Sequence, residues 1–214
     1  MPVLFRDRRF VVLDKPAGLA VHPGPRGGPS VEDAFPALRA EARTRDGPWL
    51  AHRLDADTAG CLVVALRKSA LLAAQAAFAE GRAGKTYWAV LRGAPAAESG
   101  VVDAPLARRD GPGGWRMAVD SAGQAAVTEW TVLGRGAGVS WVEFRPRTGR
   151  THQIRVHAAS LGTPIAGDAR YGGGEGAMHL LARAIALPLD PAVAAVAEPP
   201  GAMRALLRAA GWPG

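Results

Sequence analysis

Residues 52–65, HRLDADTAGCLVVA, pass from a polar segment into a continuous apolar run. From Cys61 onward the run has the pattern of a strand buried on both faces, which predicts a place inside a sheet. The polar segment before it puts the carboxylate of Asp55 beside His52 and Arg53. A single loop aspartate commonly closes a turn with its own side chain, so Asp55 by itself indicates no particular chemistry.

Further short strands, separated by turn residues, are expected along most of the chain. The predicted strands cover residues 10–13, 19–21, 61–66, 85–91, 101–108, 115–119, 126–133 and 139–144, with one more in MHLLARAIALPLDP. Because these strands follow one another in hairpin order, we expect an α+β fold. It would have a mixed, mostly antiparallel sheet with flanking helices, and 214 residues suffice for one core or for two small subdomains that share a cleft.

Four helices are predicted from apolar spacing and capping residues. They are a helix from Ser30 to about Arg43, one over 69–80 with Ser69 as N-cap and Gly81 as stop, one over 151–161, and a closing helix in PPGAMRALLRAAGW. Pro36 argues against the first, and Ile154 and Val156 also fit a strand. RRDGPGG (108–114) is expected to be an exposed hairpin tip with two arginines at its base.

Composition favours an anionic partner. The 214 residues carry a formal net charge of +7, and lysine occurs only at Lys15, Lys68 and Lys85, so the positive charge is mostly arginine. Guanidinium groups match phosphate oxygens and stack on bases, which makes a nucleic acid the first expectation. A genome-wide preference for arginine codons is the alternative, and placement of the arginines has to decide.

Other features point to a soluble cytoplasmic protein. Cys61 is the only cysteine, which excludes a disulfide framework and a thiolate zinc cluster. The first residues, MPVLFRDRRFVVLDKP, are charged early and lack the apolar core of a secretion signal. No apolar run is long enough for a membrane span.

Several long segments together resemble the RluA-type pseudouridine synthases in order and spacing. They are VVLDKPAGLAVHPG (11–24), HRLDADTAG (52–60), GKTYWAV (84–90), RTGRTHQIRVHAASLGTPIAGDARYGG (147–173) and the tail segments MHLLARAIALP and PPGAMRALL. The resemblance extends from about Phe10 to about Leu207. With no basic S4-type RNA-binding domain before the KPAG segment, the chain is similar to the single-domain form of that family. The resemblance implies that residues 1–214 form one catalytic domain, whose two subdomains share a central active-site cleft.

The resemblance implies that uridine in RNA is isomerised to pseudouridine, with Asp55 as nucleophile. The reaction breaks the C1′–N1 bond, turns the base and joins C1′ to C5, without redox change or cofactor. A carboxylate suits this task because it can attack the electron-poor sugar carbon, or start elimination at the sugar, and leave again. Asp57, two residues on, is a competing carboxylate, but the family motif aligns on the aspartate after Arg53-Leu54.

Two more catalytic residues are implied by the resemblance. Arg155 matches the arginine that pairs with the catalytic carboxylate, since an aspartate in a water-poor pocket needs a cation to stay ionised. Without the family, Arg155 would be assigned to a solvated helix face. Tyr87 matches the active-site tyrosine, which could stack on uracil near C5. Adjacent strand residues face opposite sides, so Trp88 is expected to pack in the core instead.

Residues that would bind RNA surround these positions. Arg53 matches the family position whose guanidinium enters the RNA as the target base leaves its stack; a salt bridge inside its own loop is the alternative. His52, Arg150, Thr151 and His152 complete the expected RNA contacts, those before the third helix by adding to its N-terminal N–H groups. His152 and His157 are five residues apart without a carboxylate, so no metal is expected.

The expected enzyme is therefore an RNA isomerase that acts on rRNA or tRNA as a monomer, without a membrane, a metal or an obligatory protein partner. One alternative is a non-catalytic RNA-binding or ribosome-assembly module on the same fold. Another is a retaining glycosidase, which would need a second carboxylate, and no second motif supplies it. The sequence leaves open which uridine is modified and by which chemical path at C1′.

Overall fold

The computed structural model describes residues 1–24, 27–43, 46–111 and 114–214. The chain forms two compact units. The first comprises Met1–Lys85 and Leu181–Glu198, and the second comprises Thr86–Leu180 and Pro199–Gly214. The middle of the chain thus belongs to the second unit, and both units are completed by segments close to the C-terminus.

The first unit is built on a sheet with the strand order β1-β2-β4-β11. Its strands are β1 (Val3–Arg6), β2 (Phe10–Lys15), β3 (Trp49–Leu50), β4 (Ala59–Ala65), β11 (Leu180–Leu187) and β12 (Val193–Val196). β3 pairs with β4 and β12 with β11, and only the β4–β11 pair is parallel among the described pairs. Every residue of β4 is buried, as its apolar run predicts.

Three helical segments complete the first unit: η1 (Val31–Ala34), α1 (Phe35–Ala42) and α2 (Lys68–Ala79). Pro36 lies in the first turn of α1, where no intrahelical N–H partner is lost, so the proline starts the helix instead of breaking it. Arg67, and not Ser69, is the N-cap of α2. Gly81 follows that helix with φ +70°, the left-handed conformation expected of a glycine stop.

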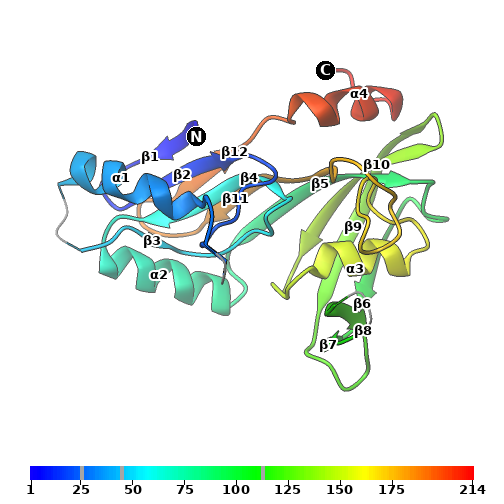
Figure 1. The fold of residues 1–214 in the computed structure, drawn as a ribbon, viewed down its shortest axis with the longest axis horizontal. Helices are drawn as coiled ribbons and strands as arrows, with labels where there is room; N and C mark the ends of the chain where they lie inside the picture. The colour runs from blue at the N-terminus through cyan, green and yellow to red at the C-terminus, as the bar shows by residue number, and fades with distance from the viewer. Residues whose placement is uncertain (25–26, 44–45, 112–113) are drawn as a thin grey trace. The chain divides into compact units, whose positions relative to one another are not determined.

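The second unit carries a sheet in the order β5-β10-β9-β6, joined by antiparallel pairing. Its strands are β5 (Gly84–Arg92), β6 (Ser99–Asp103), β9 (Val127–Gly136) and β10 (Val139–Pro146), and β7 (Leu106–Arg109) and β8 (Arg116–Val119) form a separate hairpin. Its helices are α3 (Gln153–Ser160) and α4 (Gly201–Ala209). Figure 1 shows α3 beside β9 and the β7–β8 hairpin, and both helices contact β10.

α3 and α4 pack on opposite faces of the second unit's sheet. Val142 and Phe144 of β10 join Ile154 of α3 in one apolar cluster. Glycine allows α4 to approach the other face, because a Cβ at Gly134 of β9 would collide with the carbonyl oxygen of Ala210. The helix over 151–161 is thereby confirmed, and a strand there is excluded.

Some predicted boundaries are wrong for local reasons. Residues 19–21 form no strand and contribute one isolated bridge at Ala20. The strand predicted over 101–108 is broken before Leu106, and its two halves belong to different sheets. Positive φ angles at Ala137 and Gly138 make a tight two-residue turn, so β9 extends through most of GRGAG.

One prediction falls partly on undescribed positions. Residues 112–113 of the predicted hairpin tip lie outside the described residues. The α+β class with a mixed, mostly antiparallel sheet is confirmed. In the part of the chain that the structure describes, no helix is both long and apolar enough to cross a membrane.

Candidate active site

Asp55 lies half-buried in the loop between β3 and β4. The main chain closes the turn, since the N–H of Thr58 donates to the carbonyl oxygen of Asp55 at 3.1 Å. Leu54 is buried, whereas Arg53 is exposed. The loop therefore anchors itself through Leu54 and keeps its arginine in solvent.

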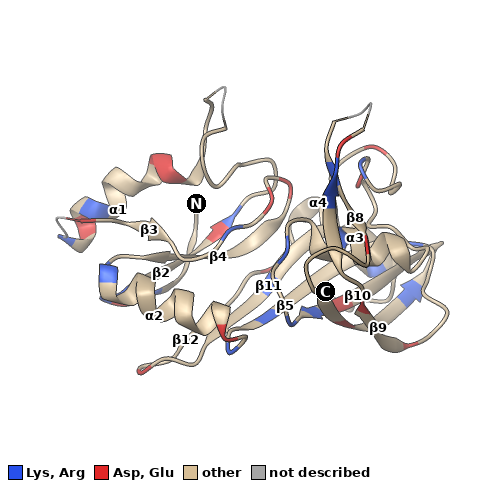
Figure 2. Ribbon diagram, turned by 90° about the horizontal axis from the view of Figure 1, so that it is seen from below, with Lys and Arg blue, Asp and Glu red and all other residues tan. Residues whose placement is uncertain are grey.

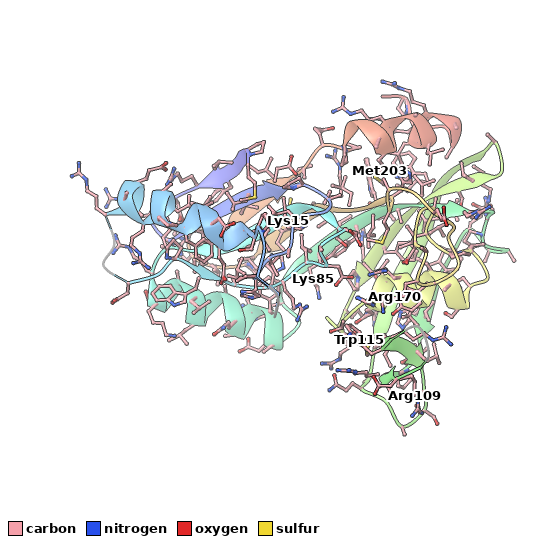
Figure 3. All side chains as sticks on the ribbon, viewed as in Figure 1. Lys15, Lys85, Arg109, Trp115, Arg170 and Met203 are labelled. Atoms are coloured by element: carbon pink, nitrogen blue, oxygen red, sulfur yellow. The ribbon has the colours of Figure 1, made fainter. Side chains whose placement is uncertain are left out.

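Lys15, labelled in Figure 3, holds this loop through hydrogen bonds, a role that the sequence did not predict. The side chain is fully buried at 0% exposure. Its Nζ donates to the carbonyl oxygens of Pro16 at 2.8 Å, Leu19 at 2.7 Å and Ala56 at 2.7 Å. Because these contacts take up all three ammonium hydrogens, Lys15 ties the Asp55 loop to the turn after β2.

Two effects act in opposite directions on the pKa of Lys15. Burial lowers the pKa of Lys15 to about 8, and the nearby carboxylates of Asp57 and Asp55 act in the opposite direction. The ammonium is therefore the main form at neutral pH. It supplies positive charge beneath the loop while its hydrogens are used by the main chain.

The side chain of His52 makes structural contacts within the first unit. Its Nε2 accepts a hydrogen bond from the N–H of Val63 at 3.0 Å, and its ring packs on Phe78 with centroids 4.9 Å apart. Burial, with a smaller contribution from Lys85, lowers the pKa of His52 to about 4. A neutral imidazole held this way fixes the start of the loop.

The low pKa of His52 predicts acid sensitivity. Between about pH 6.5 and 4 the unfolded chain binds a proton at this position and the folded chain does not, so the free energy of unfolding should fall by about 1–3 kcal/mol as pH is lowered. Urea denaturation across this range should show a shallower pH dependence for His52→Gln than for the native protein.

The matched control is His22→Gln, which removes an exposed histidine paired with Glu32 in the same unit. Burial also lowers the pKa of His157 and His179, and these groups remain in both variants. If the free energy of unfolding depended equally on pH in the native protein and in His52→Gln, the low pKa assigned to His52 would be contradicted.

Tyr87 and Trp88 lie on opposite faces of β5, as the strand geometry requires. Trp88 faces α4: its Nε1 donates to Glu143 at 3.2 Å, and its ring meets Trp141 edge-on at 4.7 Å and Trp212 at 6.5 Å. Trp88 thus makes aromatic contacts on its face of β5, but it is half-buried and not part of the buried core. Tyr87 is half-buried and packs against the apolar cluster on the α3 face.

Arg155 is buried on α3 in a two-pronged ion pair with Asp168. Nε lies 2.7 Å and Nη2 lies 2.8 Å from the two carboxylate oxygens, and the side chains are 8% and 1% exposed. The guanidinium also lies 5.1 Å from the ring centre of Tyr171. The interpretation of Arg155 as a solvated residue on a helix face is therefore wrong. Asp168 orients its guanidinium.

Glycines shape the loop that presents Asp168. The N–H of Asp168 donates to Ile165 at 3.0 Å, and Gly173 donates to the carbonyl of Asp168 at 2.8 Å. A Cβ at Gly167 or Gly173 would collide with main-chain oxygens. GDARYGG thus forms a tight loop around a carboxylate, which explains glycines that match no nucleotide-binding pattern.

The residues before α3 are held by Gln153. Its Oε1 accepts from Thr148 Oγ1 at 2.8 Å and from the N–H of Arg150 at 2.9 Å. The side chain of Arg150 donates to the carbonyl of Ala125 at 3.0 Å. Thr151 is half-buried, so this segment enters the helix in one fixed conformation.

The two histidines near α3 have separate structural partners. His152, the N-cap with φ +54°, lies 2.8 Å through Nδ1 from the Tyr171 hydroxyl. Buried His157 contacts Thr128 Oγ1 at 2.8 Å and the carbonyl of Ala104 at 3.1 Å. Among the described residues, no three acidic, histidine or cysteine side chains are grouped to hold a metal.

Each unit thus gathers part of the predicted set. The first holds His52, Arg53 and Asp55 on one loop, and the second holds Tyr87, Arg155 and residues 150–152 around α3. The sequence signal for Asp168 is a lone carboxylate among closely spaced glycines. The signal for Lys15 is a lysine between a buried strand and a turn.

The chain matches a known protein family. The model of the RNA pseudouridylate synthase family matches residues 9–160, which include the Asp55 loop, Tyr87 and Arg155. The chain belongs to the RNA pseudouridylate synthase family. The family that the sequence resembles, the α+β fold and the isomerase class are thereby confirmed.

Named relatives agree. An uncharacterized RNA pseudouridine synthase of Zymomonas mobilis is 44% identical over 172 residues, covering 79% of this chain and 78% of that protein. The ribosomal large subunit pseudouridine synthase C of Vibrio cholerae is 41% identical over 170 residues, and the match covers 79% of this chain and 52% of that enzyme. The chain thus spans about half the length of several family members.

A solved structure supports the fold. Human RNA Pseudouridylate Synthase Domain Containing 4 has a TM-score of 0.82 and 28% identity, covering 96% of this chain and 91% of the human chain. Nearly the whole chain, the family's catalytic fold included, is therefore shared with a solved pseudouridylate synthase domain.

Proposed function

We propose that this chain converts specific uridines of rRNA or tRNA to pseudouridine, with Asp55 as the nucleophile. The observation that carries the proposal is the half-buried Asp55 on a loop fixed by Lys15 and His52, within the segment that the family model matches. Relatives named for the large ribosomal subunit make large-subunit rRNA the first substrate to test.

The chemistry needs no cofactor. The C1′–N1 bond breaks, the C1′–C5 bond forms, C5 loses its proton and N1 gains one. Asp55 acts at C1′, and Tyr87 stacks on the uracil near C5. Arg155, oriented by Asp168, supplies the positive charge that keeps a carboxylate ionised out of water.

RNA binding is assigned to Arg53, His52, Arg150, Thr151 and His152. Exposed Arg53 makes the direct contact, while the other four set the conformation of the segments that meet RNA. The enzyme is proposed to act as a monomer in the cytoplasm. A non-catalytic RNA-binding module would share the fold but would not need a fixed Asp55.

The test is chemical mapping of pseudouridine in unmodified transcripts of large-subunit rRNA and tRNA after incubation with the purified protein. Conversion of a defined uridine is expected. The absence of any new pseudouridine in either RNA, and in total RNA from a deletion strain, would leave the binding module as the better assignment.

Arg53→Ala should separate base flipping from chemistry. Removing a base from its stack costs a few kcal/mol, so loss of the inserted guanidinium should slow turnover on a stem-loop by about tenfold or more and on an unstructured oligomer much less. Single-turnover rates on both RNAs measure this difference.

Arg82→Ala removes another exposed arginine of the first unit, one paired with Glu80, and should change neither rate. Equal losses for Arg53→Ala on the two RNAs would remove the flipping role.

A further inference from the structure

Trp115, directly before β8 in the segment that connects β7 to β8, is the centre of an aromatic and cationic cluster in the second unit. Its ring stacks on His152 with centroids 5.2 Å apart and planes at 21°. The guanidinium carbons of Arg108 and Arg170 lie 5.2 Å and 5.5 Å from its ring centre. Figure 3 shows Trp115 and Arg170 side by side, with Arg109 further along the hairpin.

Stacking fixes the two arginines without using up their hydrogen-bond donors. Arg170 donates through Nη1 to the carbonyl of Trp115, and Arg108 through Nη2 to the exposed carboxylate of Asp110 at 3.2 Å. A guanidinium has five N–H groups, so both side chains keep donors for an outside ligand. The side chains of Arg108 and Asp110 are 63% and 79% exposed. An ion pair this exposed adds little stability, so a bound anion can take the place of Asp110 at low cost.

The hairpin carries further positive charge on the face opposite Arg108. Arg109 and Arg116 are directly opposite each other in the β7–β8 register, and like charges in that position destabilise a hairpin. Asp120 pairs with Arg109. Figure 2 shows basic residues in blue on the β7–β8 hairpin.

The cluster is fixed to the same helix as Arg155. His152 is the N-cap of α3, and its Nδ1 lies 2.8 Å from the Tyr171 hydroxyl. That hydroxyl accepts from the N–H of Met117 on β8 at 3.0 Å. Tyr171 also lies under the guanidinium of Arg155. A ligand on the hairpin is thus held at a set position relative to α3.

We propose that Arg108 and Arg170, held over Trp115, form a second RNA contact that binds backbone phosphates of the segment next to the target uridine. Planar guanidiniums in fixed orientation match phosphate oxygens with paired N–H donors, and the surrounding arginines raise the local positive potential. The inference rests on the proposed function, because it takes RNA as the substrate. The contact positions the RNA backbone and reads no base.

The test is the salt dependence of RNA affinity, measured by fluorescence anisotropy with a labelled stem-loop of large-subunit rRNA sequence. Each phosphate contact contributes about 0.7–0.9 to the slope of log affinity against log salt. The Arg108→Ala/Arg170→Ala variant should lose about one to two from this slope and bind about tenfold or more weakly at low salt. Trp115→Ala should lose a similar amount.

Controls keep the result specific. Arg204→Ala/Arg208→Ala removes the same charge from α4, on the opposite face of the same unit, and should keep the native slope. Trp115→Phe retains an aromatic face and should recover most of the affinity if Trp115→Ala misfolds. The Arg108→Ala/Arg170→Ala variant is called the hairpin variant below. If its slope of log affinity against log salt equals that of the α4 variant, the inference is wrong.

The binding assay requires no turnover, so the two proposals fail separately. A native protein that forms no pseudouridine while the hairpin variant loses its salt slope would refute the isomerase and leave the RNA contact. An active native enzyme whose hairpin variant binds normally would refute the contact alone.

Discussion

Asp168→Ala should destabilise the protein by about 3–5 kcal/mol, because it leaves the guanidinium of Arg155 buried and without its carboxylate. Arg155 is 6% exposed and Asp168 1% exposed, so solvent does not replace the lost partner. Urea denaturation at neutral pH measures the change. Asp110→Ala removes a carboxylate from an exposed pair in the same unit and should shift stability by less than about 0.5 kcal/mol.

A double variant separates stability from function. Arg155→Met/Asp168→Leu replaces the ion pair with apolar side chains of similar size and should recover much of the stability, since such replacements are often neutral or better. It should not recover pseudouridine formation, because the proposed cation is gone. A stable and active double variant would show that the pair has only a structural role.

Asp55→Asn should reduce pseudouridine formation by about a thousandfold or more while preserving the fold and RNA binding. The amide keeps the shape of the side chain but cannot act as a nucleophile at C1′. The loop contacts of Lys15 go to main-chain carbonyls, so they do not depend on the Asp55 carboxylate. Single-turnover rates, thermal unfolding and RNA affinity together test this expectation.

Asp57→Asn is the matched control. It makes the same chemical change two residues away, at an exposed position on the same loop, and should keep activity within about threefold. If Asp57→Asn abolishes turnover and Asp55→Asn does not, the other carboxylate is the nucleophile.

The strand after Asp55 illustrates what periodicity predicts well. Seven consecutive buried residues in β4 follow from a run of small and branched apolar side chains, and the loop before it contains the polar residues of HRLD. Tyr87 and Trp88 are similarly clear, because adjacent residues of a strand face opposite sides. These predictions depend only on neighbours along the chain.

Contacts between distant segments were harder to predict. Arg155 meets Asp168 across 13 residues, through a loop whose geometry depends on glycines at 167 and 173. Lys15 meets Ala56 across 41 residues, and its place between a buried strand and a turn does not reveal which distant carbonyl its ammonium reaches. The break before Leu106 was missed because apolar residues continue on both sides of it, while the strands on either side pair with different partners.

The most direct test of the central claim uses RNA labelled with tritium at C5 of uridine. Joining C5 to C1′ releases the C5 hydrogen to water, so the native protein should release tritium in proportion to the pseudouridine formed, and Asp55→Asn should release none above background. Tritium release by Asp55→Asn at the native rate, or pseudouridine formation with no release by the native protein, would contradict the account.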